Sequence, residues 1–298
     1  TRVSLPRFIA DIPYDIPILI AGPTASGKSS LALSIAHKKG GHILNADALQ
    51  VYENWRVLTA RPNREEETLV PHSLYGHVDG TEHYSVGGWL RDIQPHLGNE
   101  HRPIIVGGTG LYFKALTSGL AQIPPTPPLV REKATEKLNT EGLEALIADL
   151  DHATQIRLDL QNPMRVQRAW EVFASTRRSI AQWQDETQPP LLELGNCSTI
   201  LFDVSKDWLN NRINKRFDKM VTSGALEEAQ NNSKNWNQNV PSSKAIGAKE
   251  LVSYLAGDLT FEEAKERATI ATRQFAKRQR TWFRSNMKNW RSVDPRQL

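Results

Sequence analysis

The chain is poor in cysteine and contains no long apolar run. Its single cysteine, Cys197, cannot form an intramolecular bridge, so a disulfide-rich scaffold is excluded. The longest apolar stretches, such as Ile16–Ala21, are far shorter than the roughly 20 residues that cross a bilayer. The sequence shows neither the apolar core nor the cleavage site of a secretory signal. We therefore expect a cytoplasmic protein that has no membrane partner.

A strong excess of one charge is also absent, but the distribution of charge is uneven. The 298 residues carry 37 Lys and Arg against 33 Asp and Glu, a net charge of +4. From Lys265 onward ten basic residues stand against only Glu266 and Asp294, so this end carries +8 and the preceding residues −4. A basic end on a slightly acidic body indicates an acidic partner for that end. Hydrophobic residues make up 39%, enough for a globular core in one or two domains.

Short apolar runs alternate with helical patterns in the first half of the chain. Ile16–Ala21, His42–Ala46 and Pro103–Val106 are the predicted strands. Helical patterns follow two of them, at Ser29–His37 and Leu111–Leu116. This alternation predicts an α/β fold with a parallel sheet flanked by helices, and it places functional sites at the carboxyl ends of the strands.

A second, all-helical domain interrupts this pattern. Pro124–Pro128 cannot continue a helix, Leu129–Gln184 has helical character throughout, and Ser198–Val204 returns to β alternation. The expected division is an inserted helical domain at residues 121–196 within an α/β domain made of residues 1–120 and 197–298.

Three helices can be described more closely. Asn162–Pro163 begins one, whose predicted buried face is Val166, Trp170 and Phe173. A second follows Ser205 and ends near Gly224, with an apolar stripe at Leu209, Ile213, Phe217 and Met220. Thr260 and Glu263 form a capping box that opens a long third helix, with a predicted apolar stripe at Ala264, Ala268, Ala271, Phe275 and Trp282.

The third helix also carries a basic face. Arg273, Lys277, Arg280 and Arg284 are spaced four, three and four residues apart. Their mutual repulsion favours a polyanion as the partner of this face. Trp282 could stack on a base, but its place on the apolar stripe favours the core.

One segment carries a specific phosphate-binding pattern. Gly22, Pro23, Thr24, Ala25, Ser26, Gly27, Lys28 and Ser29 form a complete P-loop between a predicted strand and a predicted helix. Its backbone N–H groups can hold phosphate, Lys28 can neutralise charge, and the Ser29 hydroxyl can bind Mg²⁺. The pattern leaves open whether the phosphate belongs to a nucleotide or to another diphosphate.

Two further strand ends carry candidate functional groups. Asp47 closes the second strand, where it can serve as a general base or as a helix N-cap. Gly107–Gly110 closes the third strand, where glycines allow either close approach to a ligand or a tight turn. This strand end lacks the acidic residue of a phosphate-hydrolysing P-loop enzyme. The eight histidines show no metal-ligand spacing, so we expect no structural metal.

The motifs together resemble the bacterial tRNA dimethylallyltransferases, also called tRNA isopentenyltransferases. They occur in the family's order along nearly the whole chain: GPTASGKS (22–29), DALQVY (47–52), TARP (59–62), YSV (84–86), IIVGGTGLY (104–112), NPMRVQRAWEV (162–172), RINKRFDKMVTSGALEE (212–228), AIGAKE (245–250) and TRQFAKRQRTWFR (272–284).

The resemblance implies a monomeric P-loop enzyme that uses Mg²⁺. It would move a dimethylallyl group from dimethylallyl diphosphate to N6 of adenosine 37, beside the tRNA anticodon. In the family the P-loop holds the donor diphosphate in place of ATP. The resemblance implies Asp47 as the general base, Thr24 and Arg216 as ligands of the donor's bridging oxygen side, and Lys28 as a further catalytic cation. Arg212 is the alternative to Arg216.

The implied tRNA contacts are Asp47, Ala48, Leu49, Gln50, Thr109, Arg131 and the stretch Met164, Arg165, Val166, Gln167 and Arg168, to which the charge pattern adds Arg273, Lys277 and Arg280. The sequence departs from the family at three of its motif positions. Ala48 stands where Ser is usual, Met164 where Gln is usual, and Ala248 where Tyr is usual. These departures affect local packing and tRNA contacts and leave the implied acid–base and phosphate groups in place.

Three other functions stay open at this point. An adenylate prenyltransferase would use a free nucleotide as acceptor and would need neither the helical insert nor the basic helix. A small-molecule kinase would use ATP with Asp47 as its base. A non-enzymatic RNA-binding module leaves Lys28 and Asp47 without a role.

Overall fold

The computed structural model describes residues 4–98 and 100–298. In this part of the chain six strands form one parallel sheet in the order β3-β2-β4-β1-β5-β6. The strands are β1 (Ile18–Ala21), β2 (His42–Asn45), β3 (His72–Ser73), β4 (Pro103–Gly107), β5 (Ser198–Phe202) and β6 (Arg291–Val293). The predicted parallel α/β sheet is confirmed, and β1 begins two residues later than expected, after Pro17.

The sheet is covered on both faces. Ile18, Ile20 and Ile104 pack with Leu31 and Ile35 of the helix that follows β1. The alternate strand residues, among them Leu19, Leu44 and Ile105, are equally buried. Strands buried on both faces are rich in Ile, Leu and Val, which explains why these runs were recognisable.

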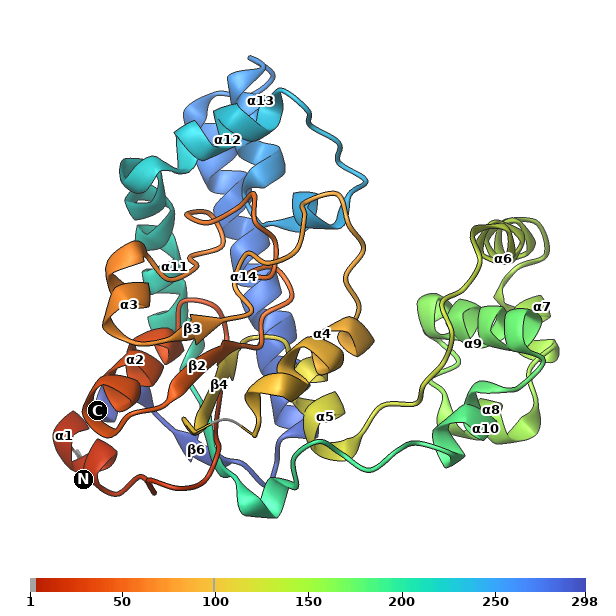
Figure 1. Ribbon diagram of the computed structural model, residues 1–298. Coiled ribbons are helices and arrows are strands. Elements are labelled where there is room, and N and C mark those ends of the chain that lie inside the picture. The colour runs from red at the N-terminus through yellow and green to blue at the C-terminus, as the bar shows by residue number, and fades with distance from the viewer. Residues whose placement is uncertain (1–3, 99) are drawn as a thin grey trace. The chain divides into compact units, whose positions relative to one another are not determined.

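The helices around the sheet come from both ends of the chain (Figure 1). α11 and α14 lie side by side, and α13 packs on α14. Their bounds are α1 (Leu5–Ala10), α2 (Lys28–Lys39), α3 (Arg64–Leu69), α4 (Val86–Ile93), α5 (Gly110–Ser118), α11 (Lys206–Met220), α12 (Leu226–Ser233), α13 (Ala248–Leu255) and α14 (Phe261–Asn286). In the described ranges no helix combines the length and the apolar character needed to cross a membrane.

The chain divides into two compact units. One comprises the chain up to Thr117 together with Leu192–Leu298, and the other is Ser118–Leu191. The sequence predicts these boundaries at residues 121 and 196. The division comes earlier at both points because α5 already ends at Ser118, and the Leu192 N–H donates a hydrogen bond back to the Leu116 carbonyl.

The second unit is helical and has its own core. Leu146, Leu150, Val166 and Ala169 form a buried apolar cluster. Its helices are α6 (Pro128–Glu141), α7 (Leu143–Ala148), α8 (His152–Arg157), α9 (Pro163–Thr176) and α10 (Ile180–Asp185). The Asn162 side chain accepts from the N–H groups of Met164 and Arg165, so the predicted start of α9 is confirmed.

Several side chains differ from their predicted burial. In α9, Phe173 is exposed and Trp170 half-buried, while Val172 is fully buried. In α14 the capping box and Ala264 and Ala268 are as predicted, but Ala271, Phe275 and Trp282 are only half-buried. The core-facing positions in the second half of α14 are Ala276, Gln279 and Phe283. The prediction considered apolar residues only, so it missed the part of the buried face that includes the polar Gln279.

Gly224 marks a kink rather than the end of helical structure. After α11 the chain passes through a short π-turn, Val221–Ala225, in which Gly224 has φ +103°. α12 then continues from Leu226. Glycine adopts this left-handed backbone without steric cost, which explains why the kink occurs at Gly224.

Candidate active site

The P-loop lies between β1 and α2, where strand and helix orient its backbone. Gly27 has φ +94° and precedes the first residue of α2, so the loop's N–H groups and the helix N-terminus share one side. Ala25 also has a positive φ, +63°. A side chain on Gly22 would come within 2.8 Å of the Ser26 Oγ, which is buried without a hydrogen-bond partner. The close packing of this loop accounts for its first glycine.

Two neighbouring helices hold the loop in place. The Gln279 Oε1 of α14 accepts a hydrogen bond from the Thr24 N–H at 2.8 Å. The Arg212 Nε of α11 donates to the Ala25 carbonyl at 2.7 Å. Arg212 is exposed, and its guanidinium lies over the Trp208 ring. Arg212 therefore braces the loop from outside.

Lys28 and Arg216 bring positive charge to the loop. Burial lowers the pKa of Lys28 to about 8, and Asp47 opposes this shift. Burial likewise lowers the pKa of Arg216 to about 10, again against the effect of Asp47. Arg216 also disfavours the charged form of Lys28. An anion bound beside them would stabilise both charged forms.

Asp47 is fixed by its own loop. Its N–H donates to the Asn45 Oδ1 at 2.9 Å, and its Oδ1 accepts from the Leu49 N–H at 2.9 Å. Asn45 is fully buried and donates to the carbonyls of Asp47 and Leu74. A turn follows Asp47, so the helix N-cap alternative is wrong. The carboxylate caps this turn and also lines a pocket.

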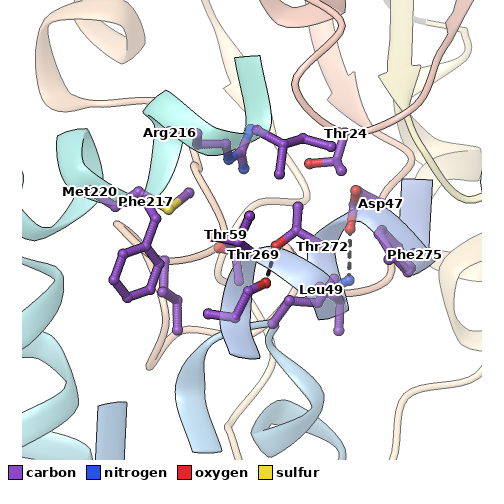
Figure 2. A pocket seen from close by; sticks show the side chains of 14 residues that line it. Thr24, Asp47, Leu49, Thr59, Arg216, Phe217, Met220, Thr269, Thr272 and Phe275 are labelled. Carbon is purple, nitrogen blue, oxygen red and sulfur yellow. Dashed lines mark hydrogen bonds between the residues drawn. The ribbon is translucent and has the colours of Figure 1, made fainter. Parts of the chain in front are cut away.

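An open pocket joins these groups (Figure 2). Thr24, Asp47 and Arg216 lie on its polar side, together with Thr59, Thr269 and Thr272. Its apolar walls are Leu49, Leu58, Ile213, Phe217, Met220, Ile246, Ala268 and Phe275. α11 and α14 supply most of this wall, through residues of their predicted apolar stripes. Apolar residues at helical spacing can line either a core or a pocket, so the spacing alone could not show which of the two they line.

The glycines at the end of β4 and in the turn after it are explained by packing inside the protein. Added side chains at Gly107, Gly108 and Gly110 would meet Ala46, Gln279 and Trp282 at 2.0, 2.3 and 2.1 Å. Close approach to these neighbours accounts for the glycine-rich turn without a ligand.

The residues around Asp47 are largely engaged with one another. The Thr109 Oγ1 accepts from the Ala48 N–H at 2.9 Å. The Gln50 Nε2 donates to the carbonyls of Thr59 and Ala60 at 2.9 and 3.0 Å. Gln50 therefore holds the 59–60 turn at the pocket wall.

In the second unit the predicted tRNA contacts differ in exposure. Arg131, Arg165 and Met164 are exposed, Met164 by 83%. Val166 is fully buried, so its side chain is not available for the predicted contact. It was included because the family resemblance implied the whole stretch 164–168, whereas the helical period had already placed it on the buried face.

The remaining two residues of that stretch have partners within the unit. The Gln167 Nε2 donates to Thr135 and to the Glu171 Oε1. Arg168 contacts Thr126 and pairs with Glu171 at 4.0 Å.

The predicted basic face of α14 is partly engaged by the protein. Arg273 donates to the Asn214 Oδ1 of α11, and Arg280 is half-buried. Lys277 and Arg284 are exposed. The four cations lie along one helix, but only part of this face is open to a partner.

Two family models match overlapping parts of the chain. A model described as IPP transferase matches residues 50–286, and one described as isopentenyl transferase matches residues 16–70. A relative named tRNA dimethylallyltransferase from Ruegeria sp. (strain TM1040) is 56% identical over 287 residues, 96% of this chain and 98% of the relative. One of the same name from Roseobacter denitrificans is 55% identical and covers 94% and 99%.

Solved structures agree with these relatives. A tRNA isopentenylpyrophosphate transferase from Bacillus halodurans is 30% identical with a TM-score of 0.66, and the match covers 94% of this chain and 90% of that one. A eukaryotic dimethylallyltransferase acting on tRNA is 25% identical with a TM-score of 0.77, and the match covers 93% and 73%. The chain belongs to the tRNA dimethylallyltransferase family of prenyltransferases.

Proposed function

We propose that this protein transfers a dimethylallyl group from dimethylallyl diphosphate to N6 of adenosine 37 in tRNA, with release of diphosphate. The observation that carries the proposal is the pocket in which Thr24, Asp47 and Arg216 meet beside apolar walls. Such a pocket offers cationic and N–H groups to a diphosphate, a carboxylate to an amine, and apolar contacts to a short prenyl chain.

The donor diphosphate binds in the P-loop, Gly22–Ser29. As the allylic C–O bond breaks, negative charge develops on the departing diphosphate. Lys28, Arg216 and the loop N–H groups stabilise that charge, and Thr24 lies at the pocket side of the loop. Gln279 and Arg212 hold the loop backbone at Thr24 and Ala25, which keeps reorganisation of the loop small during the reaction.

Mg²⁺ fits this site only as a partner of the diphosphate. The Ser29 hydroxyl is exposed beside the loop and is a suitable hard oxygen ligand. The described part of the chain holds no group of three His, Cys, Asp or Glu arranged for a metal. Ser29 would therefore share the ion with diphosphate oxygens and water. When bound, the ion supplies further neutralisation of the leaving group.

Asp47 acts on the acceptor. An adenine amine is a weak nucleophile because its lone pair is delocalised into the ring. A carboxylate hydrogen-bonded to N6 orients the amine and takes a proton as the new C–N bond forms. The target base must leave the anticodon-loop stack to reach Asp47, which lies inside the pocket.

The inserted helical unit and α14 bind the anticodon stem-loop in this proposal, through Arg131, Met164, Arg165, Arg168, Arg273, Lys277 and Arg280. These contacts would read shape and phosphates. We propose that the enzyme works as a monomer.

The decisive experiment uses tRNA from cells that lack this modification. The protein is incubated with that tRNA, dimethylallyl diphosphate and Mg²⁺, and the digested nucleosides are analysed by mass. We expect isopentenyladenosine at position 37. Prenylation of free AMP but not of tRNA would identify an adenylate prenyltransferase, and ATP consumption without a prenyl donor would identify a kinase.

A further inference from the structure

α14 buries one polar side chain where it contacts the P-loop and the turn after β4. Gln279 is 6% exposed and lies between the buried Ala276 and Phe283. Glutamine is seldom buried so completely, and its amide needs partners when it is. Nothing in the pattern of α14 as an amphipathic helix requires a polar group at this position.

Both ends of the Gln279 amide bind catalytic loops. Its Oε1 accepts from the Thr24 N–H at 2.8 Å, in the P-loop. Its Nε2 donates to the Gly108 carbonyl at 3.0 Å, in the turn after β4. β1 and β4 are paired strands, and the Gly22 N–H donates to the Gly107 carbonyl at 3.4 Å. Gln279 links the two loops one step further on, between Thr24 and Gly108.

The second of these loops borders the carboxylate. A side chain on Gly108 would lie 3.4 Å from the Asp47 Oδ2 and 3.4 Å from the Gly22 carbonyl. Thr109, the next residue, accepts from the Ala48 N–H beside Asp47. Gly108 thus lies where the Asp47 loop, the P-loop and α14 meet, and the Gln279 amide sits at that junction.

We infer that Gln279 is a positioning residue that sets the separation between the donor loop at Thr24 and the carboxylate of Asp47. This inference rests on the proposed function, in which the P-loop holds the prenyl donor and Asp47 acts on the acceptor amine. Bond formation between two bound substrates depends steeply on how they are held, and a displacement of about 1 Å costs about 100-fold. Gln279 touches neither reacting group in this role and acts through the two loops.

The amide chemistry makes the inference specific. Methionine has nearly the same length and volume but offers neither the donor nor the acceptor. Asparagine offers both but is one methylene shorter, so it cannot reach Thr24 and Gly108 together. Gln274, five residues earlier on α14, is exposed and provides a matched control for the same substitutions.

The test compares Q279M and Q279N with Q274M and Q274N. We measure kcat, KM for the donor and for tRNA, the Kd of tRNA, the Kd of inorganic diphosphate with Mg²⁺, and thermal unfolding. For both Gln279 variants we expect kcat to fall about 10- to 100-fold and diphosphate to bind more weakly, while tRNA affinity stays within about threefold of the parent. The Gln274 variants should match the parent.

Two results would overturn the inference. If kcat and diphosphate affinity are unchanged, Gln279 does not position the loops. If both variants unfold, or if tRNA affinity falls in parallel with kcat, Gln279 serves the packing of α14. A parent protein that does not prenylate tRNA would refute the proposed function instead. A loss of diphosphate affinity confined to the Gln279 variants would still support the link to the P-loop.

Discussion

Asp47 has a structural and a chemical task that two substitutions can separate. Its Oδ1 accepts the Leu49 N–H and shapes the turn, while the side chain lines the pocket. Asparagine keeps an oxygen for that hydrogen bond but is not a base. Alanine removes the hydrogen bond and the base together.

We therefore predict that D47N folds as the parent does and binds tRNA normally, but loses about 10²- to 10⁴-fold in kcat. D47A should lose as much activity and some stability as well, because the Leu49 N–H is left without its acceptor. Single-turnover prenylation and thermal unfolding measure the two effects. Near-parental turnover by D47N would exclude Asp47 as the base.

Lys28 gives the donor site a pH dependence in the alkaline range. Its pKa is lowered from 10.5 to about 8 by burial, so the free protein loses this charge as pH rises through about 8. The unfolded chain keeps the proton up to about 10.5, so protonated Lys28 costs stability at neutral pH, and that cost disappears between these values. Diphosphate affinity changes in the opposite direction: it falls as pH rises, because the anion binds the protonated form of Lys28.

We predict that the Kd of inorganic diphosphate rises between about pH 7 and 9.5 in the parent. The rise reflects loss of the Lys28 proton. K28M should bind diphosphate weakly at every pH, with this step absent, and should be no less stable than the parent at neutral pH. Calorimetric titrations at constant Mg²⁺ measure the affinity. A parent whose affinity does not change over this range would show that Lys28 keeps its proton.

At the scale of elements, α14 meets three environments along its length. Ala268, Thr272 and Phe275 face the pocket, Ala276 and Phe283 the core, and other positions the solvent. Its start was predictable because the Thr260 capping box is local. Its buried face was not predictable, because its partners come from the loops after β1 and β4 and from α11, far away in sequence. Gln279 was missed for the same reason.

Local sequence signals explain what could be predicted. The strands, the P-loop and Asp47 at the end of β2 each depend on a few consecutive residues. The choice between Arg212 and Arg216 depended on three-dimensional packing. Both lie on one helix, but Arg216 lines the pocket and Arg212 braces Ala25 from outside.

The basic face of α14 yields a prediction about salt. Removing one phosphate-binding cation should reduce the salt slope of tRNA binding by about 0.7 to 0.9. The triple variant R273Q/K277Q/R280Q should bind tRNA more weakly, with a slope flattened by about 2 to 3, and should leave diphosphate affinity unchanged. Replacing the exposed Lys234, Lys244 and Lys249 provides a charge-matched control. A slope equal to the parent's would remove this face from the tRNA footprint.

At the scale of the molecule, the helical unit leaves and re-enters the α/β unit at neighbouring points. The Leu192 N–H donates to the Leu116 carbonyl at 3.2 Å, so the two ends of the insertion are hydrogen-bonded to each other. The sheet strands and the pocket residues all belong to the first unit. The second unit has its own apolar core. The large apolar cluster on the sheet consists of residues of the first unit alone.

A variant in which a short Gly-Ser loop joins Thr117 to Leu192 should therefore keep the α/β unit folded. Such a loop has only to bridge two hydrogen-bonded ends, and its entropy cost is small. We predict cooperative unfolding, diphosphate affinity close to that of the full chain, and a large decrease in tRNA affinity, since Arg131, Arg165 and Arg168 are removed. Calorimetry with diphosphate and filter binding with tRNA separate the two functions. If the shortened protein binds tRNA as tightly as the full chain, the inserted unit has no part in recognition, and the basic face of α14 must supply it.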